Sequence, residues 1–192
     1  MRAFVSLLII VALAFGLSQG VQEAAPGQHV TGQITLGQKN DNTHPIEIIA
    51  PEELSGWTLE PGITNEQKGI LHVKAKGSWQ IKVSADAATN GYMTEYVAQA
   101  NGKNGNNNKN GDAGAYVAGG KKLQNSMKVK AEGYNEVDLK NGGVLITYED
   151  KSQGNKWQSF DIPMTFRQEV SWEDMPLPEG HVYHMAINFN PS

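Results

Sequence analysis

The sequence predicts an all-β fold, an antiparallel β-sandwich of immunoglobulin-like or jelly-roll-like form. Three observations support this prediction. Short segments alternate apolar and polar residues, turn-forming residues separate them about every ten positions, and no amphipathic helix longer than about two turns follows residue 20. Alternation with a period of two turns one side of each segment toward a core and the other toward water.

The chain begins with a segment typical of a cleaved signal peptide, so a signal helix is expected before the sandwich. Arg2 precedes an apolar run over residues 3–17, and the small residues Ser18 and Gly20 follow. The run is shorter than the roughly 20 residues that a membrane-spanning helix needs. We therefore expect residues 1–20 to direct export, with no stable membrane span after cleavage and a secreted, extracellular or cell-envelope location.

The rest of the chain suits one domain. We expect a flexible leader over residues 21–29 and a single sandwich domain over residues 30–192, long enough to bury a sizeable core. Residues 101–112 (NGKNGNNNKNGD) hold no apolar side chain and are predicted to form an Asn/Gly-rich loop. The chain has no cysteine, so its stability must come from packing and strand pairing.

The first predicted strand follows the leader directly. Val30, Ile34 and Leu36 share one face of this strand, and polar residues occupy the other face. Two uses of the strand are open: pairing within its own domain, or addition to the sheet of a neighbouring subunit, as in exported filament proteins. Val30, Ile34 and Leu36 are therefore the candidate assembly residues.

The clearest alternation lies in the middle of the chain. Residues 71–75 and 78–84 each alternate, and Trp79, Ile81 and Val83 share one parity. Because Gly77 sits in a short connection between the two segments, we expect them to form a tight β-hairpin.

Three further strands are predicted toward the C-terminus, over residues 144–148, 160–170 and 182–189. Pro163 lacks the N–H that a central ladder requires, so the strand is expected to be at an edge or bulged at that point. Arg167 lies on the polar side of the same strand, which predicts a surface or edge ion pair.

No pattern of residues points to catalysis, a metal or a cofactor. The chain contains neither a Gly-x-Ser-x-Gly elbow nor a phosphate-binding loop. His181 and His184 are three positions apart on a strand, which sends them to opposite faces, so they are expected at the surface or rim and not as ligands of one metal. Glu173 and Asp174 are expected to be solvated turn charges. The protein is therefore predicted not to be an enzyme, and a hydrolase built on these two acids is the least supported alternative.

The charge distribution disfavours nucleic acid as a partner. The formal net charge is −4, the lysines are scattered, and Arg167 is the one arginine after residue 20. Exported proteins also bind glycans, and large aromatic side chains can stack on sugar rings. Trp57 and Trp172 lie beside predicted turns and are the candidate glycan contacts.

Three segments of the sequence carry a resemblance. Residues 56–96, 123–133 and 162–189 resemble a group of secreted cell-surface proteins of methanogenic archaea, in which a signal peptide precedes a β-sandwich. The layout is also distantly similar to that of WxL-type surface domains, which Trp57-Thr58-Leu59 matches, although the second tryptophan motif of that family is not evident. The resemblance implies an envelope or extracellular structural role and carries over no catalytic residues.

These observations together favour a non-catalytic secreted or envelope-associated structural or adhesion protein. Its partners would be other proteins or further copies of itself at the cell surface. The more specific version is a filament or sheath subunit that assembles by strand addition. The alternative is an extracellular module that binds carbohydrate or cell wall.

Overall fold

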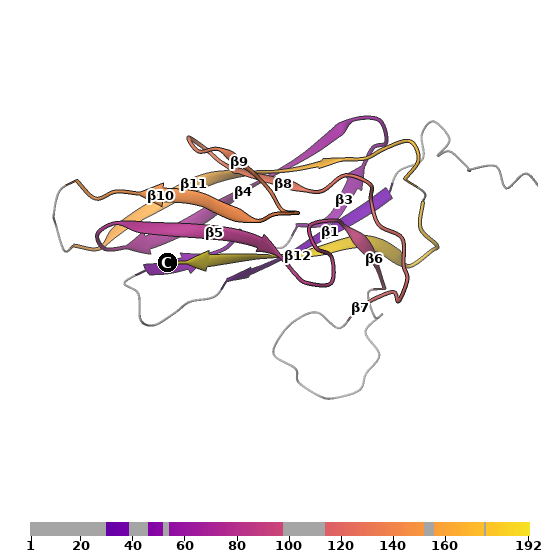
Figure 1. Ribbon diagram of the computed structural model, residues 1–192, viewed down its shortest axis with the longest axis horizontal. Helices are drawn as coiled ribbons and strands as arrows, with labels where there is room; N and C mark the ends of the chain where they lie inside the picture. The colour runs from indigo at the N-terminus through magenta and orange to yellow at the C-terminus, as the bar shows by residue number, and fades with distance from the viewer. Residues whose placement is uncertain (1–29, 39–45, 52–53, 98–113, 152–155, 175) are drawn as a thin grey trace, which may run out of the picture.

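The protein folds into β-strands throughout the part of the chain that the computed structural model describes, which is residues 30–38, 46–51, 54–97, 114–151, 156–174 and 176–192 (Figure 1). The predicted signal peptide, leader and Asn/Gly-rich loop lie outside these ranges. Within them, no helix is long and apolar enough to cross a membrane. The all-β prediction is confirmed.

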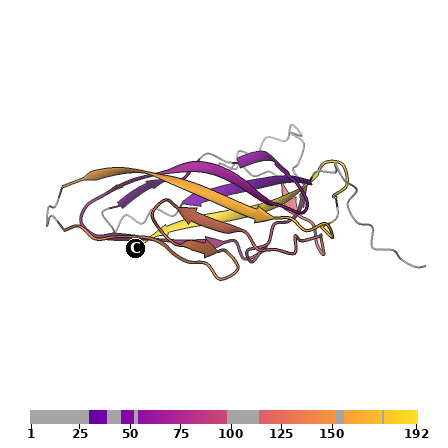
Figure 2. The same ribbon diagram turned by 90° about the horizontal axis from the view of Figure 1, so that it is seen from above.

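The strands form two curled sheets that pack against each other as a sandwich-like fold. Sheet A contains seven strands: β1 (Val30–Gln38), β3 (Leu54–Leu59), β5 (Trp79–Ala85), β6 (Thr94–Val97), β7 (Ala115–Tyr116), β10 (Gly143–Tyr148) and β12 (His181–Pro191). Sheet B contains five: β2 (Ile46–Ile49), β4 (Thr64–Ala75), β8 (Lys128–Ala131), β9 (Glu136–Asp138) and β11 (Gln158–Glu169). Figure 2 shows β4 and β11 running side by side along one layer.

The strand order explains which elements neighbour one another. Sheet A runs β10-β5-β12-β1-β3, with β6 also paired to β12 and β7 paired to β6. Sheet B runs β2-β4-β11-β8-β9. Alternate residues of each strand face the gap between the sheets, and the fully buried Ile34, Ile81, Leu71 and Phe166 come from both layers. Burial of each such side chain contributes about 1.5–3 kcal/mol to stability.

The first and last strands lie side by side in sheet A. β1 pairs in parallel with β12 from Gly32 opposite Tyr183 to Gln38 opposite Phe189. On its other side, β1 pairs antiparallel with β3. The other ladders between described strands are antiparallel, so sheet A is mixed where a purely antiparallel sandwich was predicted.

The hairpin predicted around Gly77 is wrong. β4 belongs to sheet B and β5 to sheet A, so the chain crosses from one layer to the other at residues 76–78. Gly77 has a φ of 66°, which glycine adopts without strain. Both strands direct their apolar sides into the same core, and therefore alternation alone cannot distinguish a crossover from a hairpin.

Pro163 lies inside β11, where the prediction of a local edge agrees with the structure. β8 pairs with β11 only from Met164 to Arg167 and ends just before Pro163 is reached. Beyond that point the Glu132 N–H donates to the carbonyl of Pro163 at 2.9 Å. The missing N–H of the proline therefore faces a position where the neighbouring strand has stopped.

Candidate functional site

Four side chains from four parts of sheet A form a continuous chain of hydrogen bonds, which we call the Thr35–Asp86 relay. Thr35 on β1 contacts Nε2 of His184 on β12 at 2.8 Å. Nδ1 of His184 lies 2.9 Å from the hydroxyl of Tyr116 on β7. The Tyr116 hydroxyl donates at 2.7 Å to Oδ2 of Asp86, which follows β5.

The partners of the relay fix the tautomer of the histidine. Burial, and next the neighbouring Asp86, raise the pKa of Tyr116 above its ordinary value, so the phenol keeps its one proton and gives it to Asp86. The Tyr116 oxygen must then accept from Nδ1–H of His184. When the ring is neutral, Nε2 carries a lone pair and accepts the hydroxyl proton of Thr35.

The relay contains the pairing found in activated hydroxyl groups, but its histidine is buried. A hydroxyl that donates to a neutral imidazole is the pairing of a nucleophile with a general base. However, His184 is only 2% exposed and stacks on Tyr96 with ring centroids 4.3 Å apart. The relay therefore ties β1 to β12, β7 and the end of β5, and we assign it to holding the first strand in place.

The other histidine of β12, His181, belongs to a separate pair. Nδ1 of His181 lies 2.6 Å from Oε1 of Glu95. Glu95 also accepts at 2.9 Å from the backbone N–H of Lys121 through its other oxygen. This backbone N–H, followed by the bond from His181, lowers the pKa of Glu95 from its ordinary value of 4.5. The expectation of a surface or rim position is wrong for His184, which is buried, whereas His181 is partly exposed.

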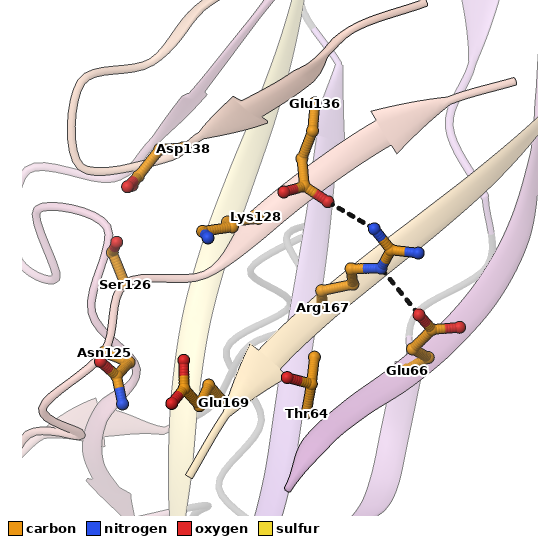
Figure 3. Close-up of a pocket in the computed structure, with 9 residues that line it drawn as sticks. All are labelled: Thr64, Glu66, Asn125, Ser126, Lys128, Glu136, Asp138, Arg167 and Glu169. Atoms are coloured by element: carbon orange, nitrogen blue, oxygen red, sulfur yellow. Dashed lines mark hydrogen bonds and ion pairs between the residues drawn. The ribbon is translucent and has the colours of Figure 1, made fainter. Parts of the chain in front are cut away.

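A polar hollow of about 560 Å³ lies on the outer face of sheet B (Figure 3). Arg167 crosses it from β11 and bridges two carboxylates: Nε donates to Glu66 at 2.7 Å, and a terminal nitrogen donates to Glu136 at 2.8 Å. These two acids raise the pKa of Arg167 further above its ordinary value, with Glu66 the larger cause. The predicted surface ion pair of Arg167 is confirmed, and it has two partners.

The acids of this hollow do not make a metal site. Asp138 and Glu169 line it together with Lys128. Across all the residues placed by the structure, no group of three or more His, Asp or Glu side chains is arranged to hold a metal ion. The hollow therefore offers hydrogen-bonding groups of both charges, on a face that water reaches.

The two tryptophans predicted to contact glycans differ in exposure. Trp57 is 4% exposed and packs in the core, so its predicted exposure beside a turn is wrong: it alternates with exposed Thr58 and shares the inward face with Leu59. Trp172 is 47% exposed. Its indole lies against Gly62, where the φ is 81° and a β-carbon would overlap the ring.

Asp174 is not the solvated turn charge that was expected. It is 3% exposed and accepts the backbone N–H groups of Ser171 at 2.7 Å and Gln124 at 3.0 Å. Burial raises the pKa of Asp174 despite these two bonds. The adjacent Glu173 is exposed and accepts from the Gln124 side chain, so the two acids hold a turn and do not face each other across a cleft.

The candidate assembly residues lie on β1 as predicted. Ile34 is fully buried, Leu36 is half-buried, and the side chain of Val30 lies outside the described residues. Sequence reasoning missed the role of Thr35 on the opposite face of this strand. Its partner His184 is 149 positions away, so only the parallel pairing of the two terminal strands brings them together.

No protein-family model matches the chain, and no curated protein matches it.

Replacing Thr35 with valine should destabilise the protein. Valine keeps the shape of threonine but removes the hydroxyl that contacts Nε2 of the buried His184, and loss of such a hydrogen bond costs about 1–3 kcal/mol. Urea denaturation of Thr35→Val measures this loss. Thr31→Val is the matched control, because Thr31 lies on the same strand and is exposed. Equal losses in the two variants would show that the relay does not hold β1.

Replacing Glu95 with glutamine should remove part of the pH dependence of stability. A carboxylate whose folded pKa lies below 4.5 adds stability that is complete above that value and is lost as pH falls through the folded pKa. The difference in unfolding free energy between wild type and Glu95→Gln should thus be largest near pH 6 and shrink toward pH 3. The contribution of Asp174 cancels in this difference. A difference that is constant with pH would contradict the assignment.

Proposed function

We propose that this is a non-catalytic, exported structural or adhesion protein of the cell surface or envelope, whose subunits join by exchange of β1. The observation that carries the proposal is the parallel pairing of the first and last described strands at the centre of sheet A. The signal-like segment over residues 1–20 supports export.

The parallel pair makes β1 a separable part of the sheet. Parallel neighbours need a long crossover connection when they follow each other in the chain. β1 and β12 are instead the first and last described strands, so the chain that connects them runs through all the strands between them. The same nine-residue strand from a second copy would make the same contacts with β12 and β3, which is the condition for strand exchange.

β1 makes contacts on both of its faces. Ile34 is completely buried in the core, and Gly32 lies so close to Leu59 and Met93 that a β-carbon there would be 3.0 Å from the leucine. The Thr35–Asp86 relay adds a polar contact on the other face of β1. A donor strand would therefore be recognised on both faces, by its apolar side chains on the core side and by the hydroxyl of Thr35 on the outer side.

One observation also favours a second candidate function, glycan binding through Trp172. The indole rests against the tight turn at Gly62 and remains about half exposed. A large aromatic ring held by a rigid turn, with free surface, is suited to stacking on a sugar.

Cysteine pairs test strand exchange directly, because the chain has no cysteine of its own. Thr31 and Thr58 are both exposed and directly opposite in the antiparallel β1–β3 ladder. If β1 comes from a neighbouring subunit, oxidised Thr31→Cys/Thr58→Cys should give a ladder of covalent multimers in secreted material. If β1 stays in its own domain, the same variant gives only an internally linked monomer, which contradicts exchange.

The control places a second pair where exchange is not proposed. Gln80 and Thr147 face each other between β5 and β10, with their side chains 3.2 Å apart. Gln80→Cys/Thr147→Cys should yield a monomer with an internal disulfide whatever happens to β1. Multimers from this pair would mean that the cross-linking reports crowding and not strand exchange.

Glycan binding is tested by a glycan array with Trp172→Ala. Binding should be seen with wild type and lost in the variant, since the stacking surface is removed. Trp157→Ala is the matched control, because Trp157 is 43% exposed and lies beneath the ammonium groups of Lys74 and Lys76. No binding by wild type, or equal loss in both variants, would refute this role of Trp172.

A further inference from the structure

One edge of sheet B is left open by the strand order. β11 pairs with β4 along all twelve residues of β4, but β2 covers the other side only from His72 to Ala75. Among the residues that the structure describes, Thr64–Leu71 thus have no strand on this side. An unpaired edge of this length is a template for another strand.

The backbone groups of this edge point outward at every second residue. Pro163 lies opposite Ile70 and directs its carbonyl to Glu132, away from β4. In an antiparallel ladder the opposing residue then also turns its N–H and C=O away, so those of Ile70 face the open edge. By the same alternation, so do those of Thr64, Glu66 and Lys68.

The surface beside this edge is hollowed where β2 ends. A hollow of about 490 Å³ lies there, and Pro51 lies against Gly69 within it. The hollow is lined by Ile49, Ala50, Pro51, Leu54, Lys68, Gly69, Ile70 and His72. Ile49 is 63% exposed and Ile70 is 49% exposed. An added strand would cover these apolar side chains as well as pair with the backbone.

We propose that this edge pairs with the same edge of a second copy, antiparallel and about a two-fold axis at Gln67. In that register Glu66 of each copy lies opposite Lys68 of the other, and Thr64 lies opposite Ile70. Opposite charges directly across an antiparallel pair are stabilising. The axis makes the contact isologous and joins the two five-stranded sheets into one.

The neighbouring registers are excluded by charge and by the pleat. An axis at Lys68 or at Glu66 sets two like charges directly opposite each other, which is destabilising. An axis between two residues would set outward residues opposite core residues such as Leu71. The strand length also fits, because Gly62 of one copy, in the turn before β4, meets His72 of the other, the first residue of β4 that pairs with β2.

A single cysteine tests both the contact and its register. Gln67→Cys places two cysteines opposite each other at the axis, in a non-hydrogen-bonded pair where the Cα atoms approach to about 4.5 Å. Mild oxidation of the purified protein should give a disulfide-linked dimer. Thr165→Cys, on β11 in the middle of the same sheet, should stay monomeric. No dimer from Gln67→Cys, or equal dimer from Thr165→Cys, would overturn the proposal.

Charge exchange provides an independent measurement. Lys68→Glu turns both attractive pairs into repulsions and should raise the dimer dissociation constant about tenfold or more in sedimentation equilibrium. The double variant Glu66→Lys/Lys68→Glu exchanges the two charges across the axis and should restore dimerisation, with loss of the ion pair between Glu66 and Arg167 inside each copy. Lys130→Glu is the matched control, since Lys130 is exposed in the same cross-strand row but away from the edge.

Two results of the sedimentation experiment would refute the contact: a wild-type protein that is monomeric at about millimolar concentration, a very weak affinity, or a Lys68→Glu variant that dimerises as wild type does. Circular dichroism confirms that each variant folds. This contact does not depend on exchange of β1, and neither result bears on the Thr31–Thr58 cross-link.

Discussion

The position of β1 between β12 and β3 is the interaction on which sheet A depends. Among the strands that the structure describes, β1 alone connects β3 to the rest of sheet A. Its inward side supplies the fully buried Ile34 to the core, and its outward side supplies Thr35 to the relay. Since the chain has no disulfide to hold this strand, packing and hydrogen bonds must do so on both faces. Loss of β1 would leave a slot through the middle of the sheet.

The hydrogen bonds and ion pairs between side chains also hold strands together. The Thr35–Asp86 relay joins strands that are distant in the chain, and the Glu95–His181 pair fastens β6 to the start of β12. On the opposite layer, Arg167 links β4 to β9 through two carboxylates. Each of these groups holds neighbouring strands together, and burial and the close contacts within them account for the shifted pKa values of Tyr116, Glu95 and Arg167.

The sequence predicted local structure well because alternation records which side of a strand is buried. Ile34, Ile81 and Val83 face inward and Arg167 faces outward, as their parity requires. Alternation does not record which sheet a strand joins, and for this reason the crossover after β4 was predicted as a hairpin.

The sequence-based prediction of side-chain exposure failed where the tertiary fold determines which side chains are buried. Trp57 stands beside a turn in the sequence, yet its strand directs it inward, while Asp174 is drawn inward by two backbone N–H donors. The relay was invisible for a related reason. Nothing in a linear pattern indicates that Thr35 and His184 will meet until the two terminal strands are known to be adjacent and parallel.

The parallel arrangement of β1 and β12 also determines how the domain responds to force. A pull on the N-terminal end of β1 against the C-terminal end of β12 acts along both strands in opposite directions, so it loads their ladder in shear. All the hydrogen bonds from Gly32 to Gln38 then share the load at once, whereas an antiparallel terminal pair would open one bond at a time. A domain tethered by its two ends in this way resists tension through its geometry, without any covalent cross-link.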